Sequence, residues 1–226
     1  MSKKKQFGIL CSFLVLTSSF ILHGENKLPN DIRWVRESSE YNNLCAQIFT
    51  QARKEIIKTT KSERNRKNHA VVVDLDETVL DNSRYQVERW ETGLSFTQDS
   101  WSDWVNREDA ELISGAKVFL TAIRKEGVQV IFLSNRMDSN LKPTLRNLEA
   151  LGVLDSSDLF LLRKNKFDTK ETRRSEVLEG KGRMKKHGPL KVIGYVGDQM
   201  GDFPNESKAD FGKSNFLLPN PMYGKW

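Results

Sequence analysis

The chain has 226 residues, which is enough for one domain with a full hydrophobic core and too few for two large ones. Hydrophobic residues make up 38% and charged residues 29%, proportions that argue against a disordered or membrane-embedded protein. The net charge of +6 falls to +3 without the first 24 residues, because these hold three lysines and no acidic residue. This mildly basic balance favours phosphorylated small molecules and gives no support for nucleic acid as a partner.

Residues 1–24 have the layout of a secretory signal peptide. Three lysines precede an apolar run at 7–22, and cleavage after Ser19 or Gly24 would leave a mature chain from about residue 25. We therefore expect export to the periplasm, the outer membrane or the medium. An uncleaved membrane anchor and a lipid on Cys11 stay open as alternatives.

Residues 38–59 predict an amphipathic helix that Ser38 or Ser39 can cap. Its apolar side chains recur at spacings of three and four, at Tyr41, Leu44, Cys45, Ile48, Phe49, Ala52 and Ile56. After removal of the signal peptide Cys45 is the only cysteine, which excludes an intramolecular disulfide. Its place on the apolar stripe predicts a buried free thiol.

From residue 70 onward, short apolar runs alternate with segments long enough for helices. The runs are Ala70–Leu75, Val128–Leu133, Leu159–Leu162, Val192–Val196 and Phe216–Leu218, and the expected helices are 116–125, 141–151 and 169–186. Continuous runs of Val, Ile and Leu are typical of parallel strands covered on both faces. The pattern predicts an α/β fold with a Rossmann-like, doubly wound parallel sheet.

Residues 82–113 break this alternation and predict a small helical cap over the carboxyl end of the first strand. The insertion is rich in aromatic residues, namely Tyr85, Trp90, Phe96, Trp101 and Trp104. For each of them alone, a small local core is better supported than a place in a pocket. We divide the mature chain 25–226 into a core at about 68–81 and 114–226, and a cap at about 82–113 together with the helix 38–59.

Four polar clusters follow the apolar runs. They are Asp74-Leu75-Asp76-Glu77-Thr78, Ser134-Asn135-Arg136, a segment that includes Lys170, and Gly197-Asp198-Gln199-Met200-Gly201-Asp202. Each is weak evidence alone, since turns and strand ends use such residues freely. Because parallel strands end at one edge of a sheet, the four clusters together predict a single crevice.

The residue types in this crevice suit metal-assisted phosphoryl transfer. Converging carboxylates repel one another unless a cation joins them, and Mg²⁺ prefers oxygen ligands. Asp74 can attack phosphorus to give an aspartyl-phosphate, and Asp76 can act as general acid and base. Asp198 would bind the metal, and Asp202 would bind it or orient its waters.

Three further residues would bind the phosphate. Ser134 and the Asn135 amide can hold its oxygens, and the ammonium group of Lys170 can offset negative charge on nucleophile and substrate. Lys166 is the alternative to Lys170. We favour Lys170 because it begins the helical segment that leads to the strand at Val192.

The string Val71-Val72-Val73-Asp74-Leu75-Asp76-Glu77-Thr78-Val79-Leu80-Asp81-Asn82-Ser83 resembles the haloacid dehalogenase superfamily. More narrowly, the chain is similar to the bacterial class C non-specific acid phosphatases, a family that includes 5′-nucleotidase lipoproteins. The likeness covers about residues 34–226. It runs through Trp101-Ser102-Asp103-Trp104, Ser134-Asn135-Arg136, Gly197-Asp198, Asp202-Phe203, Phe211-Gly212-Lys213 and the C-terminal Leu218–Trp226.

The resemblance implies a core with a small cap, Mg²⁺ as cofactor, and hydrolysis of nucleoside monophosphates and similar phosphomonoesters. It places the nucleophile at Asp74, the acid/base at Asp76, phosphate binders at Ser134 and Lys170, and metal ligands at Asp74, Asp198 and the Asp76 carbonyl. Asp202 matches the second acidic position of the last loop. An aromatic clamp on the nucleobase would consist of Trp101, Tyr223 and Trp226.

Several alternatives stay open at this level. The scaffold could serve a phosphotransferase, or a catalytically silent binding protein at the cell surface. A nucleic-acid phosphatase is disfavoured, because acidic residues intersperse the basic stretch 163–186 and no aromatic platform accompanies it. Membrane anchoring through the N-terminal segment and a homodimer are further expectations about partners.

Overall fold

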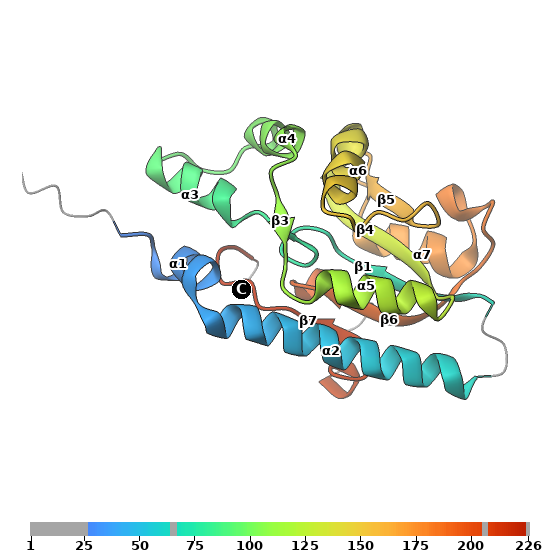
Figure 1. Ribbon diagram of the computed structural model, residues 1–226. Helices are drawn as coiled ribbons and strands as arrows, with labels where there is room; N and C mark the ends of the chain where they lie inside the picture. The colour runs from blue at the N-terminus through green and yellow to red at the C-terminus, as the bar shows by residue number, and fades with distance from the viewer. Residues whose placement is uncertain (1–26, 64–66, 205–207, 225–226) are drawn as a thin grey trace, which may run out of the picture.

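The computed structural model of the protein describes residues 27–63, 67–204 and 208–224, so the predicted signal peptide lies outside the described part. At its centre is a five-stranded, all-parallel sheet in the order β5-β4-β1-β6-β7 (Figure 1). The strands are β1 (His69–Val73), β4 (Gln129–Met137), β5 (Leu159–Arg163), β6 (Lys191–Gly197) and β7 (Asn215–Leu217). Each of the five predicted runs overlaps one strand, and every residue of β1 is buried, as expected for a central strand.

Helices cover both faces of the sheet, which confirms the doubly wound α/β fold. On one face α2 (Ser39–Ser62) and α5 (Ala116–Lys125) run side by side and pack on the strands through a large apolar cluster (Figure 1). Leu148 of α6 (Leu141–Ala150) joins this cluster. On the other face, α7 (Lys170–Glu179) packs on β4, and Val177 contributes to a second cluster.

Helix α2 begins where the sequence predicts. The Ser38 hydroxyl accepts a hydrogen bond from the Tyr41 amide at 3.0 Å, and Cys45 is a buried free thiol whose pKa burial raises to about 11. The assignment of this helix to the cap is wrong, because α2 packs on α5, β6 and β7. An unpredicted short helix, α1 (Asn30–Glu37), precedes it and contacts the cap, where Arg36 donates to the Ser83 hydroxyl at 3.0 Å.

The helix expected over 169–186 is shorter than predicted, since α7 ends at Glu179. Gly180 takes up a left-handed conformation with a φ of 63° and approaches the backbone closely. A Cβ atom at position 180 would lie 2.4 Å from the Pro189 nitrogen. Glycine therefore permits the chain to turn back here, and a residue with a side chain would not fit.

The cap grows out of a two-stranded antiparallel ribbon of β2 (Leu80–Asp81) and β3 (Glu111–Leu112). It contains α3 (Ser83–Glu91) and α4 (Gln98–Arg107), which lie beyond this ribbon (Figure 1). The ring of Tyr85 meets that of Trp101 edge-on at 5.0 Å and that of Trp104 at 6.2 Å, and all three side chains are buried. These three aromatic residues thus form the local core that the sequence favoured, whereas Trp90 is half-buried and Phe96 is exposed.

Within the described residues, no helix joins the length and the apolar character that crossing a bilayer requires.

Candidate active site

The carboxyl ends of the two neighbouring strands β1 and β6 place the first acidic residues side by side. Val73 is paired with Val196 in the sheet, and the Asp74 amide continues the ladder with a 2.9 Å bond to the Val196 carbonyl. Asp198 follows the end of β6 directly. Two segments far apart in the sequence therefore deliver carboxylates to one point, as the parallel topology predicts.

Asp74, Asp198 and Asp202 form a buried cluster whose ligand oxygens lie within 4.8 Å of one another. Burial raises the pKa of Asp74 well above its ordinary value, opposed by the Lys170 ammonium and reinforced by the neighbouring carboxylates. Burial, and next the charge of Asp202, raise the pKa of Asp198 to about 6. These shifts reflect burial first and crowded negative charge second, and a bound cation would favour the ionised carboxylates.

Lys170, the first residue of α7, supplies the positive charge in the cluster. Its Nζ lies 2.8 Å from Oδ1 of Asp74 and also contacts Oδ1 of Asp202. Burial alone would lower the pKa of Lys170, but the two carboxylates outweigh that effect and raise it. Lys166 is exposed, and its ammonium group lies over the Phe167 ring at 5.0 Å. The structure therefore brings Lys170, and not Lys166, to the carboxylates.

Asp202 is held by the loop that follows β6. Its Oδ2 accepts the backbone amides of Asp198 at 3.1 Å and Gln199 at 3.0 Å. The chain passes very close to this carboxyl group, because a Cβ atom at Gly197 would lie 2.3 Å from the same oxygen. Asp202 thus fixes the shape of the loop and also faces the cluster through Oδ1.

A tight turn follows Asp74. The Leu75 carbonyl accepts the amides of Val79 at 2.9 Å and Leu80 at 2.8 Å, and Glu77 has a φ of 55°, which is unusual for a residue with a side chain. Glu77 is buried and its carboxyl group is fully engaged: Oε1 accepts the Asn82 amide at 2.9 Å and Oε2 accepts the Tyr223 hydroxyl. These contacts hold the strained turn.

The Asp76 carboxyl group is hydrogen-bonded to residues outside the carboxylate cluster. Its Oδ1 accepts from Arg136 Nε at 2.9 Å and from Asn82 Nδ2 at 3.0 Å, and its Oδ2 accepts from the Ser134 hydroxyl at 3.3 Å. The carboxyl group of Asp76 is not part of the cluster that could share a metal ion, and a metal contact through its backbone carbonyl stays a prediction.

Ser134 and Asn135 lie at the end of β4. The buried Ser134 hydroxyl also accepts the Arg136 amide at 3.1 Å. The Asn135 side chain is exposed at the surface, and its Oδ1 accepts from the Arg173 guanidinium at 2.6 Å. Burial lowers the pKa of Arg173 to about 10, and the same guanidinium donates to the Leu161 carbonyl at 3.0 Å. Arg173 thereby ties the C-terminal part of β4 to α7.

The C-terminal segment 218–224 passes over this edge of the sheet as a strap. Asn220 Nδ2 donates to Oδ2 of Asp198 at 2.8 Å, and the Tyr223 hydroxyl donates to Glu77. Of the proposed aromatic clamp, Tyr223 is half-buried beside the site, Trp101 lies in the core of the cap, and Trp226 lies outside the described residues.

Sequence reasoning gave no role to several residues that contact the site side chains, among them Glu77, Asn82, Arg136 and Asn220. Two signals could have pointed to them. Glu77, Asn82 and Arg136 belong to the same polar strings as the predicted residues. Asn220 lies between Pro219 and Pro221. The two prolines disfavour a helix or an inner strand here, so the Asn220 side chain is available for a contact elsewhere in the fold.

The donor set fits a hard divalent cation. The cluster holds three buried carboxylates and one ammonium group, which contacts two of them, so negative charge is in excess, and every available ligand atom is an oxygen. Mg²⁺ and similar ions take such ligands, whereas zinc and copper favour nitrogen and sulfur.

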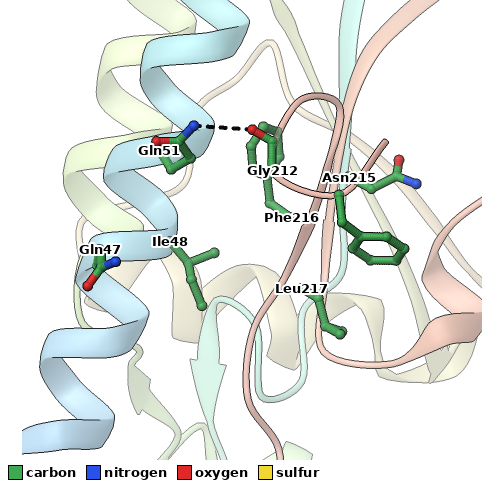
Figure 2. A pocket seen from close by; sticks show the side chains of 8 residues that line it. Gln47, Ile48, Gln51, Gly212, Asn215, Phe216 and Leu217 are labelled. Atoms are coloured by element: carbon green, nitrogen blue, oxygen red, sulfur yellow. Dashed lines mark hydrogen bonds between the residues drawn. The ribbon is translucent and has the colours of Figure 1, made fainter. Parts of the chain in front are cut away.

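The pocket in Figure 2 is a separate feature, with a volume of about 400 Å³, between α2 and the edge strand β7. Its lining is neutral, with Gln47 and Ile48 on the helix side, and Gln51 donates to the Gly212 carbonyl at 3.2 Å. None of the acidic or basic residues named above lines it. The chemistry therefore belongs to the carboxylate cluster.

Comparison with known proteins identifies the family and the fold. The family described as HAD superfamily, subfamily IIIB (Acid phosphatase) matches residues 22–226. Two curated soybean (Glycine max) proteins are similar: the stem 31 kDa glycoprotein is 27% identical over 69% of this chain, and the stem 28 kDa glycoprotein is 24% identical over 67%. The chain spans only 59% and 58% of these relatives' lengths.

Two solved structures of a class C acid phosphatase from Bacillus anthracis have the same fold. The one with tungstate bound is 30% identical with a TM-score of 0.74, and the other is 29% identical with a TM-score of 0.75. Each comparison covers 87% of this chain and 84% of the other.

Proposed function

The chain belongs to the acid phosphatases of HAD subfamily IIIB, and from this premise we propose that it is a Mg²⁺-dependent phosphomonoesterase that works through an aspartyl-phosphate. The observation that carries the proposal is the contact of Asp74 with Lys170 inside a cluster that also contains Asp198 and Asp202. A nucleophilic carboxylate, a fixed ammonium group and two further oxygen ligands are what phosphoryl transfer to a carboxylate requires.

In the first step, a carboxylate oxygen of Asp74 attacks phosphorus and the ester bond to the leaving oxygen breaks. The leaving oxygen takes a proton from Oδ2 of Asp76, because Oδ1 already accepts N–H groups from Arg136 and Asn82. Lys170 lies against both Asp74 and Asp202 and would stabilise charge on the transferring group. A bound Mg²⁺, held by Asp74, Asp198, Asp202 and the Asp76 carbonyl, would neutralise phosphate charge.

In the second step, Oδ2 of Asp76 removes a proton from water, and the resulting hydroxide attacks phosphorus. The bond between phosphorus and the Asp74 oxygen breaks, inorganic phosphate leaves, and Asp76 is again protonated. Ser134 and the Asn135 amide hold phosphate oxygens throughout. One similar structure carries tungstate, a tetrahedral oxyanion like phosphate, which supports an oxyanion site in this fold.

We further propose nucleoside monophosphates as the substrate class. Support comes from the family resemblance of the tail and from Tyr223, whose hydroxyl is anchored on Glu77 beside the turn that carries Asp74. An aromatic ring fixed at such a place can stack on a base. Export, with residues 1–24 as signal peptide, is part of the same proposal and rests on the sequence pattern.

The test is release of inorganic phosphate by the mature chain, residues 25–226, from a panel of phosphomonoesters. Nucleoside monophosphates, sugar phosphates and glycerol phosphate are compared in Mg²⁺ and in EDTA. We expect hydrolysis in Mg²⁺ only, with the lowest KM for the nucleotides. Added glycerol as acceptor separates hydrolysis from phosphotransfer. No phosphate release under any metal or pH condition would favour a silent binding protein instead.

A further inference from the structure

The Asp76 carboxyl group is held on one side by an unusually dense set of donors. Oδ1 accepts Arg136 Nε at 2.9 Å and Asn82 Nδ2 at 3.0 Å, and the second guanidinium nitrogen of Arg136 lies 2.8 Å from the same oxygen. Oδ2 accepts only the Ser134 hydroxyl, at 3.3 Å, among the bonds of the described residues. The Asp76 carboxyl group is thus held by several donors through Oδ1 and by a single longer hydrogen bond through Oδ2.

Arg136 is itself almost fully buried, with 1% of its side chain exposed. The guanidinium also donates to the Thr144 hydroxyl at 3.2 Å and to Oδ1 of Asn82 at 3.3 Å. A buried guanidinium is costly unless its charge and donors are satisfied, so this geometry is strongly determined. None of the steps proposed above requires a direct contact between Arg136 and the phosphate.

Asn82 extends the arrangement into the cap. Its side-chain oxygen accepts the indole N–H of Trp104 at 2.8 Å, while its side-chain nitrogen donates to Asp76. Trp104 lies in α4 and is buried in the aromatic core of the cap. A continuous set of hydrogen bonds therefore joins the cap to the carboxyl group.

We propose that Arg136 is a positioning residue for the acid/base: it fixes Oδ1 of Asp76 so that Oδ2 faces the reacting oxygen, and Asn82 links this orientation to Trp104 of the cap. The inference rests on the proposed function, since it assigns a partner to the proton-transfer step. A guanidinium that contacts one carboxylate oxygen through two of its nitrogens can impose such an orientation, and a lysine ammonium, a point charge on a flexible stem, cannot.

The proposal predicts a dependence on the leaving group. The leaving group of p-nitrophenyl phosphate is a stabilised nitrophenolate, which leaves without much help from an acid. The leaving oxygen of glycerol phosphate would be an alkoxide and must be protonated as the bond breaks. Loss of orientation at Asp76 should therefore damage hydrolysis of the alkyl ester far more than hydrolysis of the aryl ester. A purely structural role would lower both rates by the same factor.

The experiment compares kcat/KM for the two esters in the full-length protein, its Arg136→Lys variant and a matched control, Arg124→Lys. Arg124 forms a comparable pair with Asp158, at 3.0 and 2.7 Å, outside the site. We expect Arg136→Lys to lower the rate on glycerol phosphate at least ~10-fold more than the rate on p-nitrophenyl phosphate. Arg124→Lys should change both rates by equal factors.

Equal losses on both esters in a folded Arg136→Lys protein would overturn the proposal. If that variant does not fold, Trp104→Phe decides, because it removes the indole N–H that Asn82 accepts, keeps an aromatic ring in the core of the cap, and should give the same selective loss at a smaller factor. Equal losses there would overturn it too. A wild-type protein that hydrolyses neither ester would instead refute the proposed function, and the role of Arg136 with it.

Discussion

The Nζ atom of Lys170 lies 2.8 Å from Oδ1 of Asp74, so that an ammonium group at the start of α7 meets a carboxylate at the end of β1. The contact has a clear electrostatic purpose. Burial and the neighbouring acids favour the neutral form of Asp74, and Lys170 opposes them. Since only the ionised carboxylate can attack phosphorus, the lysine helps keep the proposed nucleophile in its reactive state.

Asp74→Asn should abolish turnover without loss of the fold. The amide cannot attack phosphorus, so we expect kcat to fall at least ~10³-fold. The change also removes one charge from a crowded acidic cluster, so the free energy of unfolding in EDTA should not decrease. Phosphate release and thermal unfolding measure the two effects. Asp155→Asn, the same change on an exposed carboxylate, is the control, and substantial activity in Asp74→Asn would exclude this nucleophile.

Stabilisation by Mg²⁺ should grow as the pH rises from about 4 to about 6. The pKa of Asp198 is raised from 3.8 to about 6 in the metal-free fold, so protonated Asp198 contributes stability below pH 4 that is lost as the pH rises through about 6. This loss is on the order of 3 kcal/mol. Mg²⁺ binds the ionised carboxylate and offsets this loss of stability, whereas at lower pH protons compete with the metal for the carboxylate.

The measurement is the difference in Tm between Mg²⁺ and EDTA from pH 4.5 to 7.5. We expect a small difference at the acidic end and an increase across the window between 4 and 6. A difference that does not change with pH would contradict the metal role of Asp198.

The strand-end residues of the site could be predicted from the sequence, for a simple reason. Asp74 and Asp198 each follow a fully apolar run, and parallel topology alone brings such residues to one edge. The same logic placed Lys170 at the start of a helix on that edge.

The orientation of Asp76 and the path of the C-terminal strap could not be predicted. Both depend on contacts between single polar side chains distant in the sequence, such as Arg136 with Asp76 and Asn220 with Asp198. No periodicity encodes such contacts. The end of α7 differs from these cases, because a glycine in the left-handed conformation at a helix end, here Gly180, is a signal that the sequence does carry.

Asn220→Ala should weaken metal binding while leaving the chemistry intact. The Asn220 amide donates to Asp198 at 2.8 Å and orients this carboxylate from outside the cluster. Loss of such a partner usually costs 10- to 100-fold in metal affinity, so we expect the Mg²⁺ concentration for half-maximal activity to rise ~10-fold. Saturating Mg²⁺ should restore kcat. Asn43→Ala on the surface of α2 is the control, and an unchanged Mg²⁺ dependence of Asn220→Ala would contradict the orienting role.

Gly197 and Gly201 lie in the same segment and offer a matched pair of substitutions. A Cβ atom at position 197 would lie 2.3 Å from Oδ2 of Asp202, whereas a Cβ atom at position 201 has no neighbour within 4 Å. Gly197→Ala must therefore displace the Asp202 carboxyl group, which accepts the amides of Asp198 and Gln199.

We expect Gly197→Ala to lower the free energy of unfolding by about 1–3 kcal/mol, as overpacking in a tight interior does. It should also raise the Mg²⁺ requirement ~10-fold, because Asp202 would leave its position against Lys170. Gly201→Ala should change stability by less than about 0.5 kcal/mol and leave activity unaltered. Chemical denaturation measures the stability of each variant, and titration of activity with Mg²⁺ measures its metal requirement. If Gly197→Ala lost stability but kept its Mg²⁺ dependence, Asp202 would serve the loop alone and take no part in metal binding.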